Sequence, residues 1–145
     1  MEVGTSTRFR REPAAVPAAR AFVRHALRSA GVPADVGESL VQAAAEACNN
    51  AILHAAGDTF TVTVDVQGSG VCTLTVSDVG HGFDPPEHAR MPSPQAVGHR
   101  GLALMEALVD RVNVSSTPAG TTVVLVHDAS TAASSAPRDR VVAER

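Results

Sequence analysis

The chain has 145 residues, of which 44% are hydrophobic, and its 15 acidic residues outnumber its 12 basic ones. Every basic residue is an arginine, which excludes a phosphate-loop lysine, a protein-kinase strand lysine and a Schiff-base lysine from these residues. The net charge of -3 argues against a direct nucleic-acid ligand, because duplex DNA is bound by clustered positive charge. We expect one domain with its own core.

No apolar run approaches the roughly 20 residues that a membrane helix needs, and the N-terminus shows no basic-then-apolar signal pattern. We therefore expect a cytoplasmic protein without a membrane span. The two cysteines, Cys48 and Cys72, lie in periodic apolar segments and have no second pair for a zinc site or a disulfide framework. Both are interpreted as core residues.

The N-terminal half of the chain predicts a strand followed by two helices. Residues 5–11 alternate and form a candidate edge strand, whose exposed arginines would discourage unwanted pairing. Apolar residues at helical spacing predict a helix over 16–30. Asp35 and Glu38 resemble a capping box, which opens a second helix that continues to about Ala56.

The second half predicts four strands, a long loop and one short helix. Residues 59–67 and 71–77 alternate with period two around a Gly-Ser-Gly turn, as in a β-hairpin. Residues 78–100, rich in proline and glycine, exceed the usual loop length and suggest a functional lid. The remaining predicted elements are a helix over 101–109 and strands over 111–117 and 121–127.

This order of elements predicts an α+β fold: a two-layer sandwich with a mixed sheet and with its helices collected on one face. The other face of the sheet would be open or would bind a partner. We place the domain at residues 1–128. Residues 129–145 are rich in Ala, Ser, Thr and Arg and lack apolar periodicity, so we expect a disordered tail there.

Two segments carry residue types that suit a nucleotide. The second helix presents Glu46 and Asn50 one turn apart, where a carboxylate can deprotonate a hydroxyl and an amide oxygen can ligate Mg²⁺. Asp78 ends a strand and is followed by Gly80 and Gly82, which let the backbone approach a flat ligand while the carboxylate accepts hydrogen bonds from a purine amine.

A third segment suits phosphates. Gly101 opens the short helix, whose free N–H groups and positive dipole end are available to anions, and Arg100 beside it is a permanent cation. Each segment alone is more often an ordinary surface feature, but the three in this order favour phosphoryl transfer. His54 and His81 are interpreted as packing or turn residues.

These segments resemble the superfamily of ATP-binding domains shared by gyrase, the large heat-shock chaperone, histidine kinases and MutL, which implies a Bergerat-type ATP-binding fold. Within it, the likeness is greatest to the anti-sigma factor serine/threonine kinases of bacterial partner switching, over roughly residues 5–127. The motifs that match the family are Glu46-x-x-x-Asn50-Ala51, Asp78-x-Gly80-x-Gly82, Gly101-Leu102 and Gly120-Thr121.

The resemblance implies a role for each matched residue. In the family the N-box asparagine holds Mg²⁺ and the glutamate is the general base, which assigns these roles to Asn50 and Glu46. The aspartate that reads adenine corresponds to Asp78. The other nucleotide contacts that the resemblance implies are Gly80, Gly82, Arg100, Gly101, Leu102 and Thr121.

The implied function is that of an ATP- and Mg²⁺-dependent serine/threonine kinase that phosphorylates a STAS-type antagonist, holds a sigma factor inactive and forms a homodimer. His99 stands where the family often has the first glycine of a G-x-G motif. Three alternatives therefore stay open. They are a nucleotide-binding partner switch without phosphoryl transfer, a detached histidine-kinase-type catalytic domain, and an α+β interaction protein that binds no nucleotide.

Overall fold

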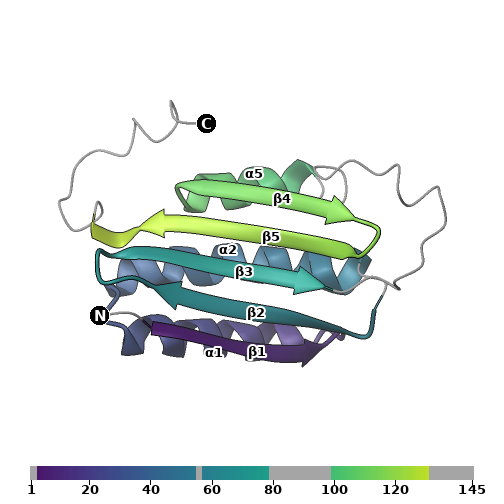
Figure 1. Cartoon of the computed structure of the whole chain (residues 1–145), viewed down its shortest axis with the longest axis horizontal. Helices are drawn as coiled ribbons and strands as arrows, with labels where there is room; N and C mark the ends of the chain where they lie inside the picture. Colours follow the sequence, from purple (N-terminus) through teal and green to yellow (C-terminus); the bar gives the residue numbers. More distant parts are fainter. Residues whose placement is uncertain (1–2, 55–56, 79–98, 131–145) are drawn as a thin grey trace.

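A computed structural model describes residues 3–54, 57–78 and 99–130, which form a sheet covered by a layer of helices (Figure 1). The elements, in chain order, are β1 (Val3–Arg10), α1 (Ala15–Ser29), α2 (Ala34–His54), β2 (Thr59–Val66), β3 (Val71–Asp78), α5 (His99–Leu108), β4 (Arg111–Thr117) and β5 (Gly120–Asp128). Within these residues no helix is long and apolar enough to cross a membrane.

The strands form one five-stranded sheet in the order β1-β2-β3-β5-β4. The predicted α+β class is confirmed, but the prediction of a mixed sheet is wrong, since every pairing between the described strands is antiparallel. The reason lies in the last hairpin. β3 and β4 run in the same direction, and β5 folds back between them, so the two strands that would have paired in parallel are not neighbours.

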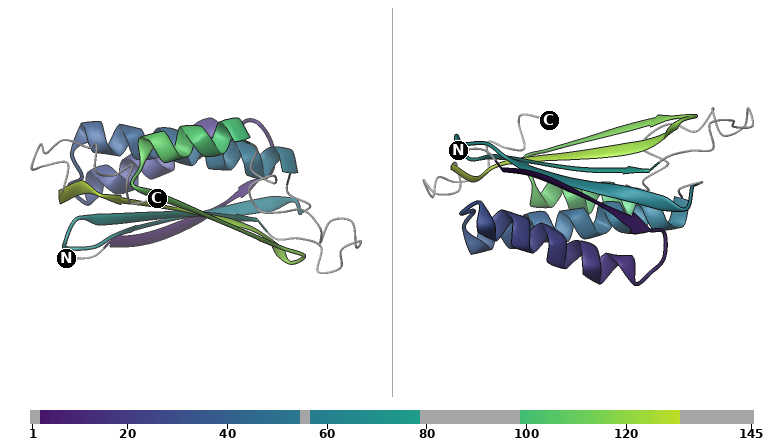
Figure 2. Two further views of the ribbon diagram at one scale, coloured as in Figure 1. Left: turned by 90° about the horizontal axis from the view of Figure 1, so that it is seen from above. Right: turned by 60° about the horizontal axis from the view of Figure 1, so that its bottom comes forward.

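The three helices of the described residues, α1, α2 and α5, lie on one face of the sheet, as predicted (Figure 2). The alternating sequence of β2 explains which face they cover: Phe60, Val62 and Val64 are fully buried, whereas the threonines between them are half-buried on the other face. The predicted hairpin to β3 is confirmed. Gly70 in its turn has φ of +104°, a conformation that favours glycine.

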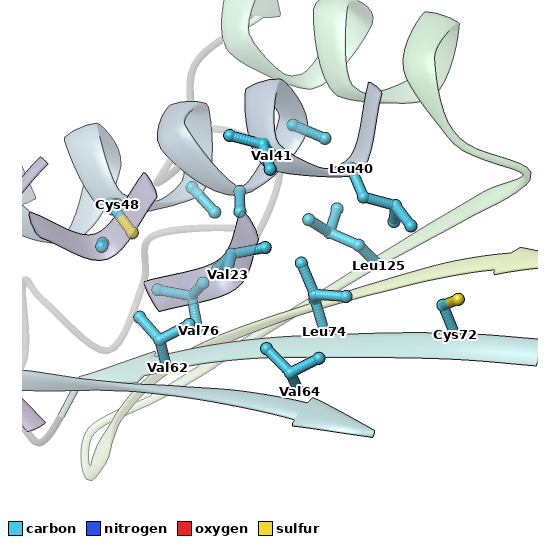
Figure 3. Close-up of a cluster of buried hydrophobic side chains, with 14 of the residues drawn as sticks. Val23, Leu40, Val41, Cys48, Val62, Val64, Cys72, Leu74, Val76 and Leu125 are labelled. Atoms are coloured by element: carbon cyan, nitrogen blue, oxygen red, sulfur yellow. The ribbon is translucent and has the colours of Figure 1, made fainter. Parts of the chain in front are cut away.

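The core lies between α2 and the central strands (Figure 3). On the helix side, small residues dominate, and Val41, Ala44 and Cys48 are buried. On the sheet side, Leu74 and Leu125 are fully buried against them. Small helix residues let α2 approach the sheet closely, and this fixes where its polar residues lie relative to the strand ends.

The predicted capping box at the start of α2 is wrong. The helix begins at Ala34, two residues earlier than the box requires, and Asp35 accepts a hydrogen bond from the adjacent N–H of Val36 at 2.9 Å. Glu38 instead faces α1 and forms a bidentate ion pair with Arg24, with N···O distances of 2.7 and 3.0 Å. A guanidinium on the neighbouring helix therefore takes the carboxylate that the sequence pattern assigned to the cap.

Three predicted features lie partly or wholly outside the described residues: the last two residues of the second helix, the lid over 79–98 and the tail over 131–145. α5 begins at His99, two residues before the predicted start. At the C-terminal side, Ala129 is buried and its N–H donates to the carbonyl of Gly70 at 2.9 Å. The packed chain thus extends past residue 128.

Candidate nucleotide site

The first part of the candidate site is one face of α2. Glu46 and Asn50 are four residues apart in a continuous helix, so their side chains lie on the same face, one turn apart. Both are half-buried, whereas their neighbours Ala47 and Ala51 are buried in the core. The helix thus holds a carboxylate and an amide at its border with solvent, anchored by small apolar residues on either side.

The first turn of α5 lies against this face. A methyl group on Gly101 would lie 3.5 Å from Nδ2 of Asn50 and 3.7 Å from Oε1 of Glu46. The start of a helix, with the N–H groups of its first turn, therefore lies against the two polar residues. Arg100 beside it is exposed, and Leu102 packs partly against the core. The structure thus brings Glu46, Asn50 and Gly101 together, and places Arg100 and Leu102 on either side of the glycine.

Asp78 is the last residue of β3, at the end of the sheet where β5 begins (Figure 1). Its Oδ1 accepts a hydrogen bond from the N–H of Thr121 at 3.1 Å. Burial raises the pKa of the Asp78 carboxyl, and the Thr121 N–H and the charge of Arg11 each lower it. The half-buried carboxylate is thus held by the backbone of β5, with a second oxygen available to another donor.

A small pocket joins these parts. It is lined by Ala47, Asn50, Ala51 and His54 of α2, Asp78 of β3, and Thr121 and Val123 of β5. Its lining combines three apolar residues with four polar ones, so polar groups from three elements converge on it. Asn50, Asp78 and Thr121, predicted from separate motifs, therefore share one pocket. Gly80 and Gly82 lie outside the described residues, so their predicted place in it stays a prediction.

Two residues near the pocket were given other interpretations from the sequence. His54 was interpreted as a packing or turn residue; it is the last residue of α2, is exposed, and lines the pocket one turn after Asn50. That spacing, four residues from a predicted ligand on the same helix, was the available signal. Arg11 was interpreted as a charge on an edge strand, and no local pattern indicates its contacts with the end of α2.

The family model for the histidine kinase-like ATPase domain matches residues 9–127, which is most of the chain. The chain belongs to this family, and the resemblance inferred from its motifs is confirmed at that level. Membership implies an ATP-binding domain, in agreement with a site that sets a carboxylate at one end and a helix N-terminus at the other.

Two individual proteins show the similarity in detail. An anti-sigma F factor from Pasteuria penetrans is 36% identical over 89 residues, which are 54% of this chain and 59% of that protein. The crystal structure of the RsbU and RsbW domains of Rv1364c from Mycobacterium tuberculosis matches with a TM-score of 0.67 and 24% identity, over 86% of this chain and 31% of that one. The match to the structure shows the fold. This chain spans less than two thirds of either relative.

Proposed function

We propose that this ATPase domain is an anti-sigma regulator with serine/threonine kinase activity, which phosphorylates a STAS-type antagonist and holds a sigma factor inactive in the cytoplasm. The similarity to an anti-sigma F factor supports the class of protein. The observation that carries the chemistry is the approach of the α5 N-terminus to Glu46 and Asn50, because this contact gathers a general base, a metal-binding amide and a phosphate-binding helix end.

The residues present fit ATP and Mg²⁺. Asp78 offers a carboxylate oxygen beside the apolar side chains of Ala47, Ala51 and Val123, which suits the amine of adenine. Asn50 offers an amide oxygen to a metal whose other ligands would be phosphates and water. When bound, Mg²⁺ neutralises charge on the phosphates. Gly80, Gly82, Arg100, Leu102 and Thr121 complete the proposed nucleotide contacts.

In the proposed reaction, Glu46 accepts the proton of the substrate hydroxyl. The hydroxyl oxygen then forms a bond to the γ-phosphorus of ATP as the bond to the β-bridging oxygen breaks, and ADP leaves. The first turn of α5 stabilises the transferred group through its backbone N–H groups. The lack of lysine is no obstacle, since helix N–H groups, Arg100 and the metal supply the positive charge.

Glu46→Gln tests the kinase. We expect phosphate transfer from γ-labelled ATP to a STAS-domain partner to fall at least about 100-fold, the usual contribution of a general base. Affinity for ATP should change by less than about threefold, because glutamine keeps the shape of the side chain. Rates come from single-turnover assays and affinities from calorimetry. Asp65→Asn removes an exposed carboxylate of β2 that pairs with Thr73, away from the strand end that carries Asp78, and is the control that should leave both unchanged.

The second candidate is a nucleotide-binding partner switch without phosphoryl transfer. The observation that favours it is that His99 is the first residue of α5, at a position where the family often has glycine. A wild-type protein that binds ATP yet labels none of its candidate partners, including a coexpressed one, would establish this alternative. The proposed homodimer is tested separately by sedimentation with and without ATP.

A further inference from the structure

The segment just after β1 reaches the end of α2, and this contact does not follow from the family motifs. Arg11 donates from Nη1 to the carbonyl of Ile52 at 2.7 Å and from Nε to the carbonyl of Gly57 at 2.7 Å. Its own N–H donates to the carbonyl of Asp58 at 2.8 Å. One residue thus ties three points of the connection between α2 and β2 to the end of β1.

The bond to Ile52 has a clear physical basis. The Ile52 carbonyl lies in the last described turn of α2. A guanidinium there gives a carbonyl of this turn a charged donor and places a positive charge at the negative end of the helix dipole. Arg11 therefore fixes the last turn of α2 more firmly than a neutral donor would.

The last turn of α2 is also a wall of the candidate site. Ala51 and His54, on either side of Ile52, line the pocket that contains Asp78. The opposite wall is reached through the sheet: Phe60 pairs with Phe9 on one side and with Asp78 on the other. Arg11 follows Phe9 by two residues and bonds to the α2 end. It therefore braces the helix wall against the strand that carries the carboxylate.

The charge of Arg11 acts on the same carboxylate. Burial raises the pKa of Asp78, and Arg11 is close enough to counter that effect in part. Arg11 itself is exposed, so its hydrogen bonds do not serve to compensate for burial of its own charge. Arg10, its neighbour, points to the open face of the sheet, because Phe9 before it packs against the core.

We propose that Arg11 is a positioning residue of the nucleotide site, which sets the separation of the last turn of α2 from Asp78 and thereby the preference for adenine. This inference rests on the proposed function, since it concerns the pocket assigned to ATP. A residue that only stabilised the fold would change how much protein is folded. A positioning residue changes which base the folded protein prefers.

The test is the ratio of ATP to GTP affinity in Arg11→Gln, measured by calorimetry on the whole chain. We expect ATP binding to weaken about tenfold, as for loss of a charged hydrogen bond, with little change for GTP. The ratio is independent of the folded fraction, because both nucleotides see the same folded protein. The matched control, Arg10→Gln, should keep the wild-type ratio.

Arg11→Lys keeps the charge but has no planar fork, and should show an intermediate ratio. If Arg11→Gln does not fold, the affinity ratio is measured on Arg11→Lys instead. A wild-type ratio in every folded Arg11 variant overturns the inference and leaves the proposed function intact. If the wild-type protein binds neither nucleotide, the proposed function fails, and this inference fails with it.

Discussion

At the scale of single residues, burial favours the protonated form of Asp78, whereas the proposed contact with adenine uses its charged form. Burial raises the pKa of its carboxyl above the ordinary value, despite the Thr121 N–H and the charge of Arg11. The folded chain therefore binds this proton more tightly than the unfolded chain does. Its contribution to folding stability is present at pH values below the ordinary pKa and is lost as pH rises through the raised pKa.

Asp78→Asn separates the effect of this carboxyl on stability from its effect on ATP binding. The amide oxygen can still accept from Thr121, and no charge is buried, so we expect the variant to be at least as stable as the wild type near pH 7. ATP affinity should fall about tenfold or more, because the charged acceptor is lost. Unfolding and calorimetry between about pH 4 and pH 8 measure both. Unchanged ATP affinity in the folded variant would show that Asp78 does not read adenine.

At the scale of elements, the decisive contact is the crossing of α5 over α2. Glycine at position 101 costs helix stability, and an alanine there would make only ordinary van der Waals contacts with Asn50 and Glu46. Sterics of the fold alone therefore do not require glycine. The space beside these two side chains is what an added methyl group would occupy.

Gly101→Ala should therefore raise the free energy of unfolding by up to about 1 kcal/mol and weaken Mg²⁺-ATP binding about tenfold. Denaturant unfolding and calorimetry measure the two effects. The reverse change on the exposed side of the same helix, Ala103→Gly, is the control: it should lose about 1 kcal/mol of stability and keep wild-type affinity. If Gly101→Ala binds Mg²⁺-ATP normally, the phosphates do not use this space.

At the scale of the whole molecule, helices cover one face of the antiparallel sheet. We therefore expect the residues on that covered face to determine folding stability. Leu74 is fully buried there, whereas Thr75, the next residue of β3, lies half-buried on the open face. The chain has no Trp and no Tyr, so circular dichroism is the suitable probe of unfolding.

Leu74→Ala should lower the free energy of unfolding by about 2–5 kcal/mol, the range for buried leucines. Thr75→Ala should change it by less than about 0.5 kcal/mol, unless this face is covered in the protein's working assembly. A large loss for Thr75→Ala that depends on protein concentration would indicate that the open face is an interface.

Ligand binding provides a test of the whole molecule. ATP with Mg²⁺ at about a hundredfold excess over Kd should stabilise the fold by about 2.7 kcal/mol. Asn50→Ala should remove the part of this stabilisation that depends on Mg²⁺ and keep the remainder. If ATP does not change the free energy of unfolding of the wild type, an α+β interaction protein that binds no nucleotide would be favoured.

The sequence by itself determined the local elements, because their signals are local. Period-two alternation identified the hairpin of β2 and β3, and helical spacing placed Glu46 and Asn50 on one face. The motif order then gave the family.

Tertiary structure decided what depends on distant partners. Only the return of β5 between β3 and β4 made the sheet antiparallel, since pairing is set by neighbours in space. Glu38 left its predicted cap because Arg24 on another helix is a stronger partner for a carboxylate. Arg11 reached the end of α2 only once the sheet had brought them together. A sequence pattern shows what a residue can bond to, and the fold determines which partner it meets.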